Sequence, residues 1–276
     1  MTVNEKAYAK INLFLDIIGR RDDGFHEIIS VMRTVSLCDG ITLSASPADR
    51  KCISIHTNNK LLQCNEDNLI YKSAYKYLSY FDIDAKIEVS LDKQIPIGAG
   101  LGGGSSDAAA TLRAMNRIFG RATKSQLLEI AGETGSDVSF CIDGGSAICT
   151  GRGEIVRPYN YSFPTDIVIA IGSSRVSTPK AYALLDEKYG DFREYNENKS
   201  LPHLSCMPVY NIFESVIKLD EIECIKQIMK LNGASEALMS GSGPAVFGGF
   251  CSEYDAAVAE NALKSKGYLA FKCRLL

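Results

Sequence analysis

The chain has 276 residues, of which 46% are hydrophobic and 23% charged, so it is long enough for one large or two small globular domains and too apolar for wholesale disorder. Thirty basic and thirty-three acidic side chains give a formal net charge of −3, which argues against a surface that holds nucleic acid. Nine cysteines without a C-x-x-C pair and three widely spaced histidines predict reduced thiols, no disulfide framework and no histidine-based metal site.

The first predicted element is a strand over residues 3–17, in which apolar side chains occupy every odd position except that of Glu5. A period of two is typical of a half-buried strand, and it places Lys10 and Asn12 together on the face opposite the apolar set. A glycine-bounded turn over residues 19–24 follows, and strand-like segments continue to about residue 55.

The middle of the chain is predicted to alternate helices with short strands around a glycine-rich segment. In order, the elements are a helix over 68–81, a strand over 86–92, a helix from the glycine-rich segment to Phe119, a helix over 125–133, a strand-like segment over 138–142 and a hairpin over 144–153.

Beyond about residue 157 the pattern changes, and we place a domain boundary there. The expected elements are a strand over 166–172, a helix over 179–189, a polar loop over 191–206, helices over 209–218 and 221–231, strands over 237–240 and 245–250, a helix after Ser252 and a strand over 268–275. Asp220 is expected to cap the helix over 221–231. Apart from the additional helices this is the β-α-β-β-α-β order of a ferredoxin-like domain. The predicted fold class is therefore α+β, with an N-terminal mixed domain over 1–157 and a C-terminal ferredoxin-like domain over 158–276.

The glycine-rich segment satisfies G-x-G-x-x-G at Gly98, Gly100 and Gly103, which is also the fingerprint of dinucleotide-binding Rossmann folds. The strand before it alternates polar and apolar residues, whereas a parallel Rossmann strand is apolar throughout. No second strand ending in an acidic residue follows the helix, and no Gly-Lys-Ser/Thr completes a Walker A sequence. Both of these nucleotide-binding folds are therefore disfavoured.

Five of the seven residues over 98–104 are glycine, and they lead directly into a predicted helix. Backbone N–H groups without side chains, at the positive end of a helix, form a favourable site for a phosphate group. The alternative is a plain tight turn with Ser105 or Ser106 as the N-cap. Because so many glycines cost more conformational entropy than a cap requires, phosphate binding is the favoured interpretation.

Three further residues are weak signals when each is taken alone. Lys10 could be a solvated strand lysine, Asp137 a turn residue and His26 an ordinary surface histidine. The segment over 238–248 is a glycine-containing hairpin that could form a second anion-binding nest.

Taken together and in this order, the motifs resemble the GHMP kinase superfamily over nearly the whole chain. The similarity is carried by residues 7–13 with 19–27, by 96–109 and by 241–248. The triple glycine over 101–107 together with the sequence Asp-Gly-Phe-His over 23–26 is similar to the members that act on a cytidine-diphosphate-linked methylerythritol. Members that act on mevalonate, homoserine or galactose are less well matched.

The resemblance implies an ATP-dependent small-molecule kinase, a transferase of isoprene and terpenoid biosynthesis, that phosphorylates the 2-hydroxyl of 4-diphosphocytidyl-2-C-methyl-D-erythritol. Asp137 would be the general base, and Lys10 would neutralise charge on the attacking oxygen and the transferring phosphoryl group. Substrate contacts are implied for Asn12, Phe25, His26 and Tyr182. In this assignment His26 and the Phe25 backbone form hydrogen bonds with the edge of cytosine, and Tyr182 stacks on the base.

The ATP-binding residues that the resemblance implies include the glycine-rich segment and two residues outside it. They are Asn68, Lys93, Pro96, Ile97, Gly98, Ala99, Gly100, Leu101, Gly102, Gly103, Gly104, Ser105 and Ser106. Mg²⁺ is expected with ATP because it neutralises phosphate charge, and the sequence does not choose between Ser106 and Asp107 as the residue that faces it.

The sequence departs from the family pattern at a few positions. Phe25 stands where the family commonly has Tyr, which preserves the ring and loses the hydroxyl. Ser139 and Cys141 replace the usual Pro and Phe that follow the aspartate at 137, so the local backbone there is expected to differ.

The expected partner is the small-molecule substrate, with no nucleic acid or membrane, and the expected state is a monomer or weak homodimer. The N-terminal residues lack the order of a signal peptide and no apolar run reaches about 18 residues, so a cytoplasmic location is expected. Two alternatives stay open: another GHMP-type kinase acting on a substrate such as mevalonate or homoserine, and a non-catalytic nucleotide-binding module.

Overall fold

The computed structural model describes residues 1–190, 192 and 208–276. The chain forms two compact units. Unit 1 contains residues 1–9, 37–97 and 102–144, and unit 2 contains residues 10–36, 98–101 and 145–276.

The chain therefore passes between the two units several times, and two long strands belong to both. These are β1 (Thr2–Arg20) and β2 (His26–Pro47). Because the division follows contacts and not a single point in the chain, the domain boundary expected near residue 157 stays a prediction.

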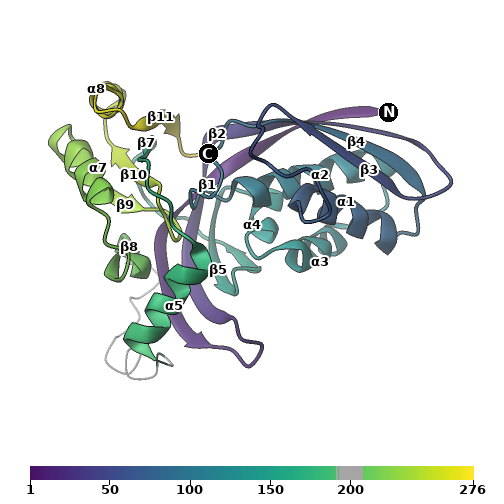
Figure 1. Ribbon diagram of the computed structural model, residues 1–276, viewed down its shortest axis with the longest axis horizontal. Coiled ribbons are helices and arrows are strands. Elements are labelled where there is room, and N and C mark those ends of the chain that lie inside the picture. Colours follow the sequence, from purple (N-terminus) through teal and green to yellow (C-terminus); the bar gives the residue numbers. More distant parts are fainter. Residues whose placement is uncertain (191, 193–207) are drawn as a thin grey trace. The chain divides into compact units, whose positions relative to one another are not determined.

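Unit 1 packs helices against a sheet in which the strand order is β3-β4-β2-β1. Its other elements are β3 (Cys52–Thr57), α1 (Leu69–Tyr80), β4 (Ala85–Asp92), α2 (Gly103–Phe119), α3 (Lys124–Thr134) and α4 (Val138–Asp143). Figure 1 shows α1, α2 and α3 on the same side of the strands β3 and β4.

Residue alternation explains how this sheet faces its helices. Along β4 buried and exposed residues alternate without exception, so Ile87, Val89 and Leu91 face the core while the polar residues between them face solvent. On α2 the apolar stripe that includes Ala108, Leu112 and Met115 is buried, as its helical spacing predicts. The long strand, the three helices and the strand over 86–92 predicted for this part of the chain are confirmed.

The strand-like prediction over 138–142 is wrong, because these residues form the short helix α4, in which all five are buried. A short apolar run does not distinguish a buried strand from a buried helix. Arg113 of α2 donates from Nη1 to the carbonyl oxygen of Cys141 (2.8 Å), which satisfies a backbone acceptor near the end of α4.

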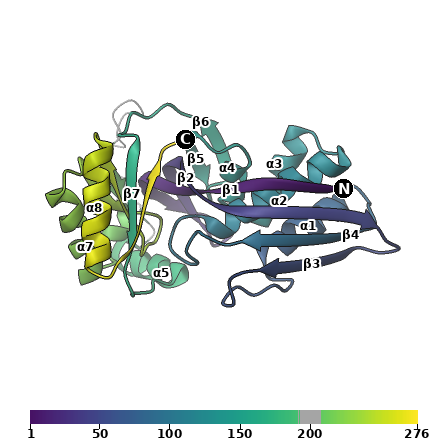
Figure 2. The ribbon, with the colours of Figure 1, turned by 90° about the horizontal axis from the view of Figure 1, so that it is seen from above.

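Unit 2 contains a four-stranded antiparallel sheet with the order β11-β7-β10-β9. Its elements are β5 (Ser146–Gly151), β6 (Ile155–Pro158), β7 (Asp166–Ile171), α5 (Thr178–Tyr189), β8 (Tyr210–Asn211), the 3₁₀ helix η2 (Ile212–Ser215), α7 (Asp220–Leu231), β9 (Glu236–Met239), β10 (Val246–Phe250), α8 (Glu253–Ser265) and β11 (Leu269–Arg274). Figure 2 shows α7 and α8 together on one face of this sheet. The predicted ferredoxin-like order and the predicted hairpin are confirmed.

The helix predicted over 209–218 is wrong. The Asn211 side chain accepts a hydrogen bond from the Phe213 N–H (2.9 Å) and starts a single 3₁₀ turn, while Tyr210 and Asn211 pair with β1. Strand pairing and a local cap therefore override the helical pattern.

The cap predicted for α7 is also wrong, because Leu219 is the N-cap and Asp220 is the first helical residue. Asp220 lies with Glu221 and Glu223 in the first turn, where negative charge stabilises the helix through its dipole. The polar loop predicted over 191–206 lies outside the described residues, apart from residue 192. Within the described part of the chain, no helix is both long enough and apolar enough to span a bilayer.

Candidate active site

The glycine-rich segment adopts a backbone that other residues rarely adopt. Gly98, Gly100 and Gly102 all have positive φ, at 67°, 80° and 67°. These left-handed conformations cost a residue with a side chain about 1–2 kcal/mol each. The glycines are therefore needed for the path of the chain, as the sequence indicated.

The helix α2 begins without a side-chain cap. Gly102 is its N-cap, and the hydroxyl of Ser106 donates to the carbonyl oxygen of Gly103 (3.1 Å). The alternative in which Ser105 or Ser106 caps the helix is therefore wrong. The first-turn N–H groups lie at the positive end of the helix dipole, which is favourable for an anion.

In unit 2 the segment over 98–101 is fixed against the turn that follows β9. The Ser240 hydroxyl donates to the Gly100 carbonyl oxygen (3.0 Å), and the Ala245 N–H donates to the Ala99 carbonyl oxygen (3.1 Å). A Cβ added at Gly100 would lie 2.2 Å from the Ser240 carbonyl oxygen. Only glycine allows this approach of the two backbones.

The turn after β9 is itself held by buried side chains. Asn211 donates from Nδ2 to the carbonyl oxygens of Met239 and Gly241, both at 2.7 Å, and the hydroxyls of Thr178 and Ser242 are 2.7 Å apart. The second glycine motif predicted over 238–248 therefore lies beside the glycine-rich segment within unit 2. Asn211 was not predicted from the sequence, because its acceptors lie some thirty residues away in the chain.

Lys10 and Asn12 share one face of β1, as predicted, but that face is buried. The side chain of Lys10 donates from Nζ to Asn12 Oδ1 (2.7 Å), Asn12 donates from Nδ2 to Ser30 Oγ (2.8 Å), and Ser30 donates to the Phe14 carbonyl oxygen (2.7 Å). Lys10 is only 4% exposed. The interpretation of Lys10 as a solvated strand lysine is therefore wrong, and this chain of hydrogen bonds orients its ammonium group.

Asp137 lies in unit 1 at the N-cap position of α4 and is partly buried. Its carboxylate makes no capping hydrogen bond to its own helix, whereas its backbone carbonyl oxygen accepts from the Cys141 N–H (3.2 Å).

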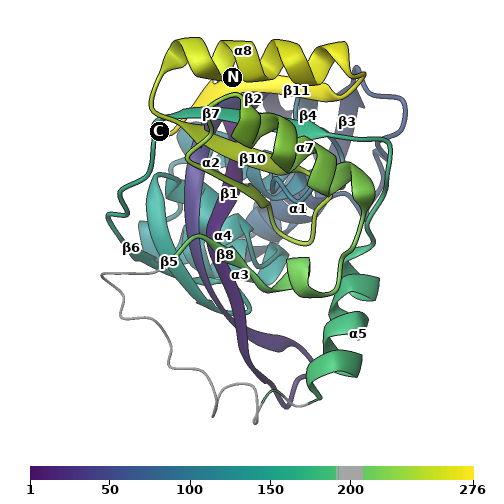
Figure 3. The same cartoon turned by 90° about the vertical axis from the view of Figure 1, so that its left-hand side faces the viewer.

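In unit 2 His26 joins the start of β2 to the helix α5, and Figure 3 shows α5 beside the β1–β2 turn. His26 Nε2 lies 2.6 Å from Asp186 Oδ1, and the Arg20 guanidinium forms a second, longer ion pair with Asp186 (3.7 Å). The Tyr182 ring stacks on the His26 ring with centroids 4.6 Å apart, and Phe192 approaches it edge-on. The structure thus brings His26 and Tyr182 together.

Phe25 has the opposite environment, since it is 51% exposed at the turn before β2. The Arg152 guanidinium carbon lies 4.9 Å from the centroid of the Phe25 ring, within the range of a cation–π interaction. The Phe25 N–H donates to Asp23 Oδ1 (3.1 Å), which fixes the turn.

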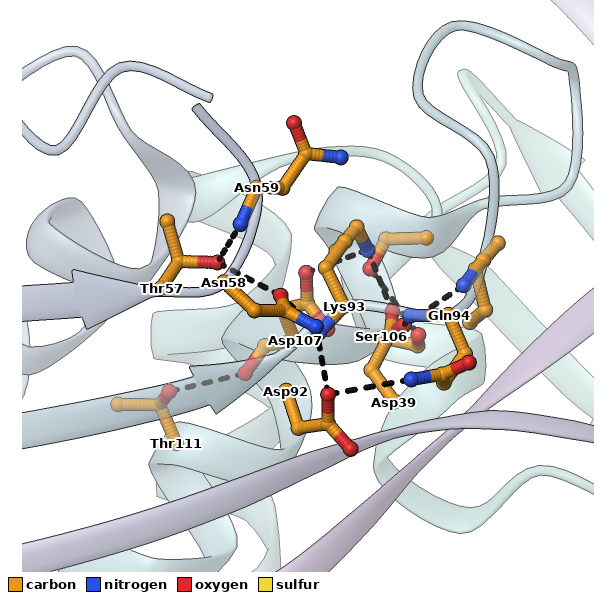
Figure 4. A network of polar contacts seen from close by, with 12 residues as sticks. Asp39, Thr57, Asn58, Asn59, Asp92, Lys93, Gln94, Ser106, Asp107 and Thr111 are labelled. Atoms are coloured by element: carbon orange, nitrogen blue, oxygen red, sulfur yellow. Dashed lines mark hydrogen bonds and ion pairs between the residues drawn. The ribbon is translucent and has the colours of Figure 1, made fainter. Parts of the chain in front are cut away.

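Lys93 lies at the centre of a buried network in unit 1, which Figure 4 shows from close by. Its ammonium group forms ion pairs with Asp39 and with Asp107 Oδ2, the second at 2.8 Å. The side chains of Lys93 and Asp107 are 3% exposed and that of Asp39 is fully buried. Asp39 also accepts the N–H groups of Gln94 (2.5 Å) and Ile95 (2.7 Å) through Oδ1.

The network holds one cation and two carboxyl groups, so its charge depends on whether Asp107 is ionised. Burial, opposed by the charge of Lys93 and assisted by that of the nearby Asp39, raises the pKa of Asp107 to about 8. Near neutral pH Asp107 therefore tends to keep its proton, and the buried charges of Lys93 and Asp39 balance.

Asn68 also lies in unit 1, where it caps the helix α1. Its Oδ1 accepts from the Ile70 N–H (2.9 Å), and its Nδ2 donates to the Gln63 carbonyl oxygen (2.7 Å). Both ends of the amide thus have backbone partners, so the structure gives Asn68 a clear structural role in addition to the predicted contact with nucleotide.

The structure adds two acidic residues that the sequence did not single out, Asp39 and Asp186. Asp39 is an isolated acid within a predicted strand region, and its partners Lys93 and Asp107 lie 54 and 68 positions further along the chain. Asp186 offered a weak signal, because it lies four positions after Tyr182 and so on the same helix face.

The model of the GHMP kinases N terminal domain matches residues 68–145, and the model of the GHMP kinases C terminal domain matches residues 182–269. Both matches cover segments described above.

Curated relatives match along most of the chain. The 4-diphosphocytidyl-2-C-methyl-D-erythritol kinase of Exiguobacterium sibiricum is 41% identical over 90% of this chain and 88% of its own length. The enzyme of the same name from Caldicellulosiruptor saccharolyticus is 37% identical over 94% of this chain and 92% of its own length.

Solved structures agree with these matches. A crystal structure of 4-(cytidine 5'-diphospho)-2C-methyl-D-erythritol kinase is 30% identical and superposes with a TM-score of 0.78 over 99% of both chains. The mevalonate kinase of Methanococcus jannaschii is 16% identical with a TM-score of 0.73 over 100% of this chain and 99% of its own, which shows a shared fold.

The approach of Gly100 to Ser240 generates a stability prediction. Gly100→Ala should lower the free energy of unfolding by more than Gly98→Ala, because only the first variant adds a backbone clash to the cost of a left-handed conformation. We expect a loss of about 1–2 kcal/mol for Gly98→Ala and a clearly larger loss for Gly100→Ala, measured by urea unfolding. Equal losses would contradict the described approach.

The raised pKa of Asp107 generates a pH prediction. Between about pH 4 and pH 8 the folded protein keeps the Asp107 proton, whereas the unfolded chain releases it. Proton binding at Asp107 therefore stabilises the folded state fully below about pH 4, and this stabilisation is lost as the pH rises through about 8. Relative to the Asp107→Asn variant, which has no such proton to lose, the parent should become progressively less stable over this interval. Unfolding by urea at several pH values measures this difference.

The exposed acid Asp84 provides the control for that experiment, since it lies in the same unit and pairs only loosely with Lys51 (3.5 Å). The free energy of unfolding of Asp84→Asn should equal that of the parent at every pH. If the free energies of unfolding of Asp107→Asn and the parent differ by the same amount at every pH, the pKa of Asp107 is not raised.

Proposed function

Since the chain belongs to the GHMP kinase family, we propose that it transfers the γ-phosphoryl group of ATP to the 2-hydroxyl of 4-diphosphocytidyl-2-C-methyl-D-erythritol, a step in making isoprenoid precursors. The observation that carries this proposal is the similarity to curated kinases of that substrate over about 90% of the chain. The glycine-rich start of α2 supports it, because it has the backbone of an anion-binding loop.

ATP is the phosphoryl donor in this proposal. Its phosphates lie against the backbone over 96–106, with Asn68 and Lys93 belonging to the same nucleotide site. Three glycines with positive φ and a helix start without a side-chain cap support the assignment, since they leave main-chain N–H groups to face phosphate oxygens.

Asp137 acts as the general base. As the substrate hydroxyl oxygen forms a bond to the γ-phosphorus, its proton passes to the Asp137 carboxylate, and the bond between that phosphorus and the β–γ bridging oxygen breaks to release ADP. General-base help of this kind contributes about 10²–10⁴ in rate. The support for this role is the partly buried carboxylate that does not cap α4.

Lys10 stabilises negative charge on the reacting oxygens. Its ammonium group is oriented by Asn12, which is fixed in turn by Ser30, so the charge is preorganised and costs little reorganisation during the reaction. Asn12 also contacts the substrate in this proposal.

The cytidine end of the substrate is bound by the turn before β2 and by α5. His26 and the Phe25 backbone read the hydrogen-bonding edge of cytosine, and Tyr182 contributes a ring. The ring stack of His26 on Tyr182 and the exposed Phe25 support this location, because they place aromatic surface in one region of unit 2.

Mg²⁺ accompanies ATP in this proposal and neutralises phosphate charge when bound. Magnesium keeps several water ligands and usually takes only one or two protein carboxylates.

A coupled ATP assay tests the proposal directly. ADP release should require 4-diphosphocytidyl-2-C-methyl-D-erythritol and should not occur with mevalonate or homoserine. Turnover of one of those two alcohols instead would favour a different small-molecule kinase. ATP binding without turnover of any of the three would favour a non-catalytic nucleotide-binding module.

Substitution of the two proposed catalytic residues gives a sharper prediction. Asp137→Asn should lower kcat by about 10²-fold or more, and Lys10→Ala by at least about tenfold, with both proteins still folded. Asp143→Asn at the exposed end of α4 and Lys6→Ala on the exposed part of β1 are matched controls that should keep the kcat of the parent. Parental activity in Asp137→Asn would end the proposed mechanism.

A further inference from the structure

We propose that Lys93 is a positioning residue for the nucleotide site: it holds the first turn of α2 in place through Asp39 and Asp107, and it does not itself contact a phosphate group. This inference deepens the proposed function and rests on it for the identity of the nucleotide. The geometry that carries it lies entirely within unit 1.

The ammonium group of Lys93 is enclosed. The side chain is 3% exposed, and its Nζ is held between the carboxyl groups of Asp39 and Asp107. Its backbone N–H donates to Asn58 Oδ1 (2.8 Å), so both ends of the residue are fixed. A lysine that binds phosphate as a point charge must present its ammonium to the ligand, and this one presents it to two buried acids.

The same ammonium group lies directly against the start of α2. A Cβ added at Gly103, the first residue of the helix, would lie 2.9 Å from Lys93 Nζ and 3.0 Å from Ile95 Cγ2. The φ angle of Gly103 is not positive, so glycine is needed here for space and not for conformation. Asp107 lies one turn further along the helix, where its ion pair fixes the same end of α2.

Asp39 extends the network to the chain that enters the glycine-rich segment. Its Oδ1 accepts the N–H groups of Gln94 and Ile95, while its Oδ2 pairs with Lys93. Asp39 comes from β2, Lys93 follows β4, and Asp107 belongs to α2, so the network joins three segments, as Figure 4 shows.

Loss of the Lys93 ammonium group would therefore shift the first turn of α2. The Asp39 carboxylate would lose its cation and Asp107 would lose a hydrogen-bond donor, and removing one partner of a buried ion pair is strongly destabilising. The N–H groups of a phosphate site must lie within about 0.5 Å of their productive position, so even a local shift would weaken the binding of ATP.

Amide hydrogen exchange in the absence of nucleotide separates positioning from direct contact. In Lys93→Met we expect exchange over residues 103–108 to be at least about tenfold faster than in the parent, because the helix start opens more easily. We also expect the KM for ATP to rise at least about tenfold and the KM for the alcohol substrate to stay within about twofold. Lys86→Met, an exposed lysine of β4, is the matched control and should leave all three quantities unchanged.

The variant Lys93→Met with Asp39→Asn removes the cation together with the carboxylate that balances its charge, and it decides the question if the single variant does not fold. Faster exchange over 103–108 in this double variant supports the proposal. Exchange equal to that of the parent in either folded variant overturns it, and a raised KM for ATP with unchanged exchange would identify Lys93 as a direct phosphate ligand. Lys93→Arg should fail to restore the KM for ATP, because the larger head group does not fit against Gly103.

Because exchange is measured without substrate, the result does not depend on the proposed function. If the parent does not phosphorylate the cytidylyl substrate but Lys93→Met still exchanges faster over 103–108, the proposed function fails and the positioning of the helix start by Lys93 stands. If the parent is active and exchange is unchanged, the proposed function stands and only the role of Lys93 is overturned.

Discussion

The structure of unit 1 around α2 depends on one buried cation placed between two acids. Lys93 joins the end of β4 to β2 through Asp39 and to α2 through Asp107, and these three segments meet at the start of α2. A buried charge without a partner would be very costly, so the geometry of each segment constrains the others. In the proposed function, phosphate binding by the loop thus depends on its support as well as on its glycines.

Unit 2 contributes a second kind of constraint, which is the close approach of two backbones. Gly100 lies against Ser240, and the turn that contains Ser240 is held by Asn211. Lys10 is oriented by hydrogen bonds that end on a backbone carbonyl oxygen, through Asn12. In both units the groups that the proposed chemistry uses are thus held by buried polar contacts, as expected of a site that is organised before its ligands bind.

Periodicity and glycine chemistry predicted much of this fold from the sequence. The alternation over 3–17, the glycine-rich segment before α2 and the ferredoxin-like order were all readable, because each depends on local patterns. The run over 138–142 was misread, since short apolar segments carry no decisive period. Within the site, Lys10 was identified as a candidate but its burial was not foreseen, and Asp39 was missed, because both features depend on residues that are distant in the chain.

The central claim is that the start of α2 and the glycine-rich segment before it receive the phosphates of ATP. Titration of the ¹⁵N-labelled protein with a non-hydrolysable ATP analogue, followed by the amide resonances, tests this most directly. The account predicts that the largest chemical-shift changes occur at the amides of residues 98–106, while the amide chemical shifts of α8 do not change. Largest shifts outside the glycine-rich segment, with residues 98–106 unmoved, would contradict it.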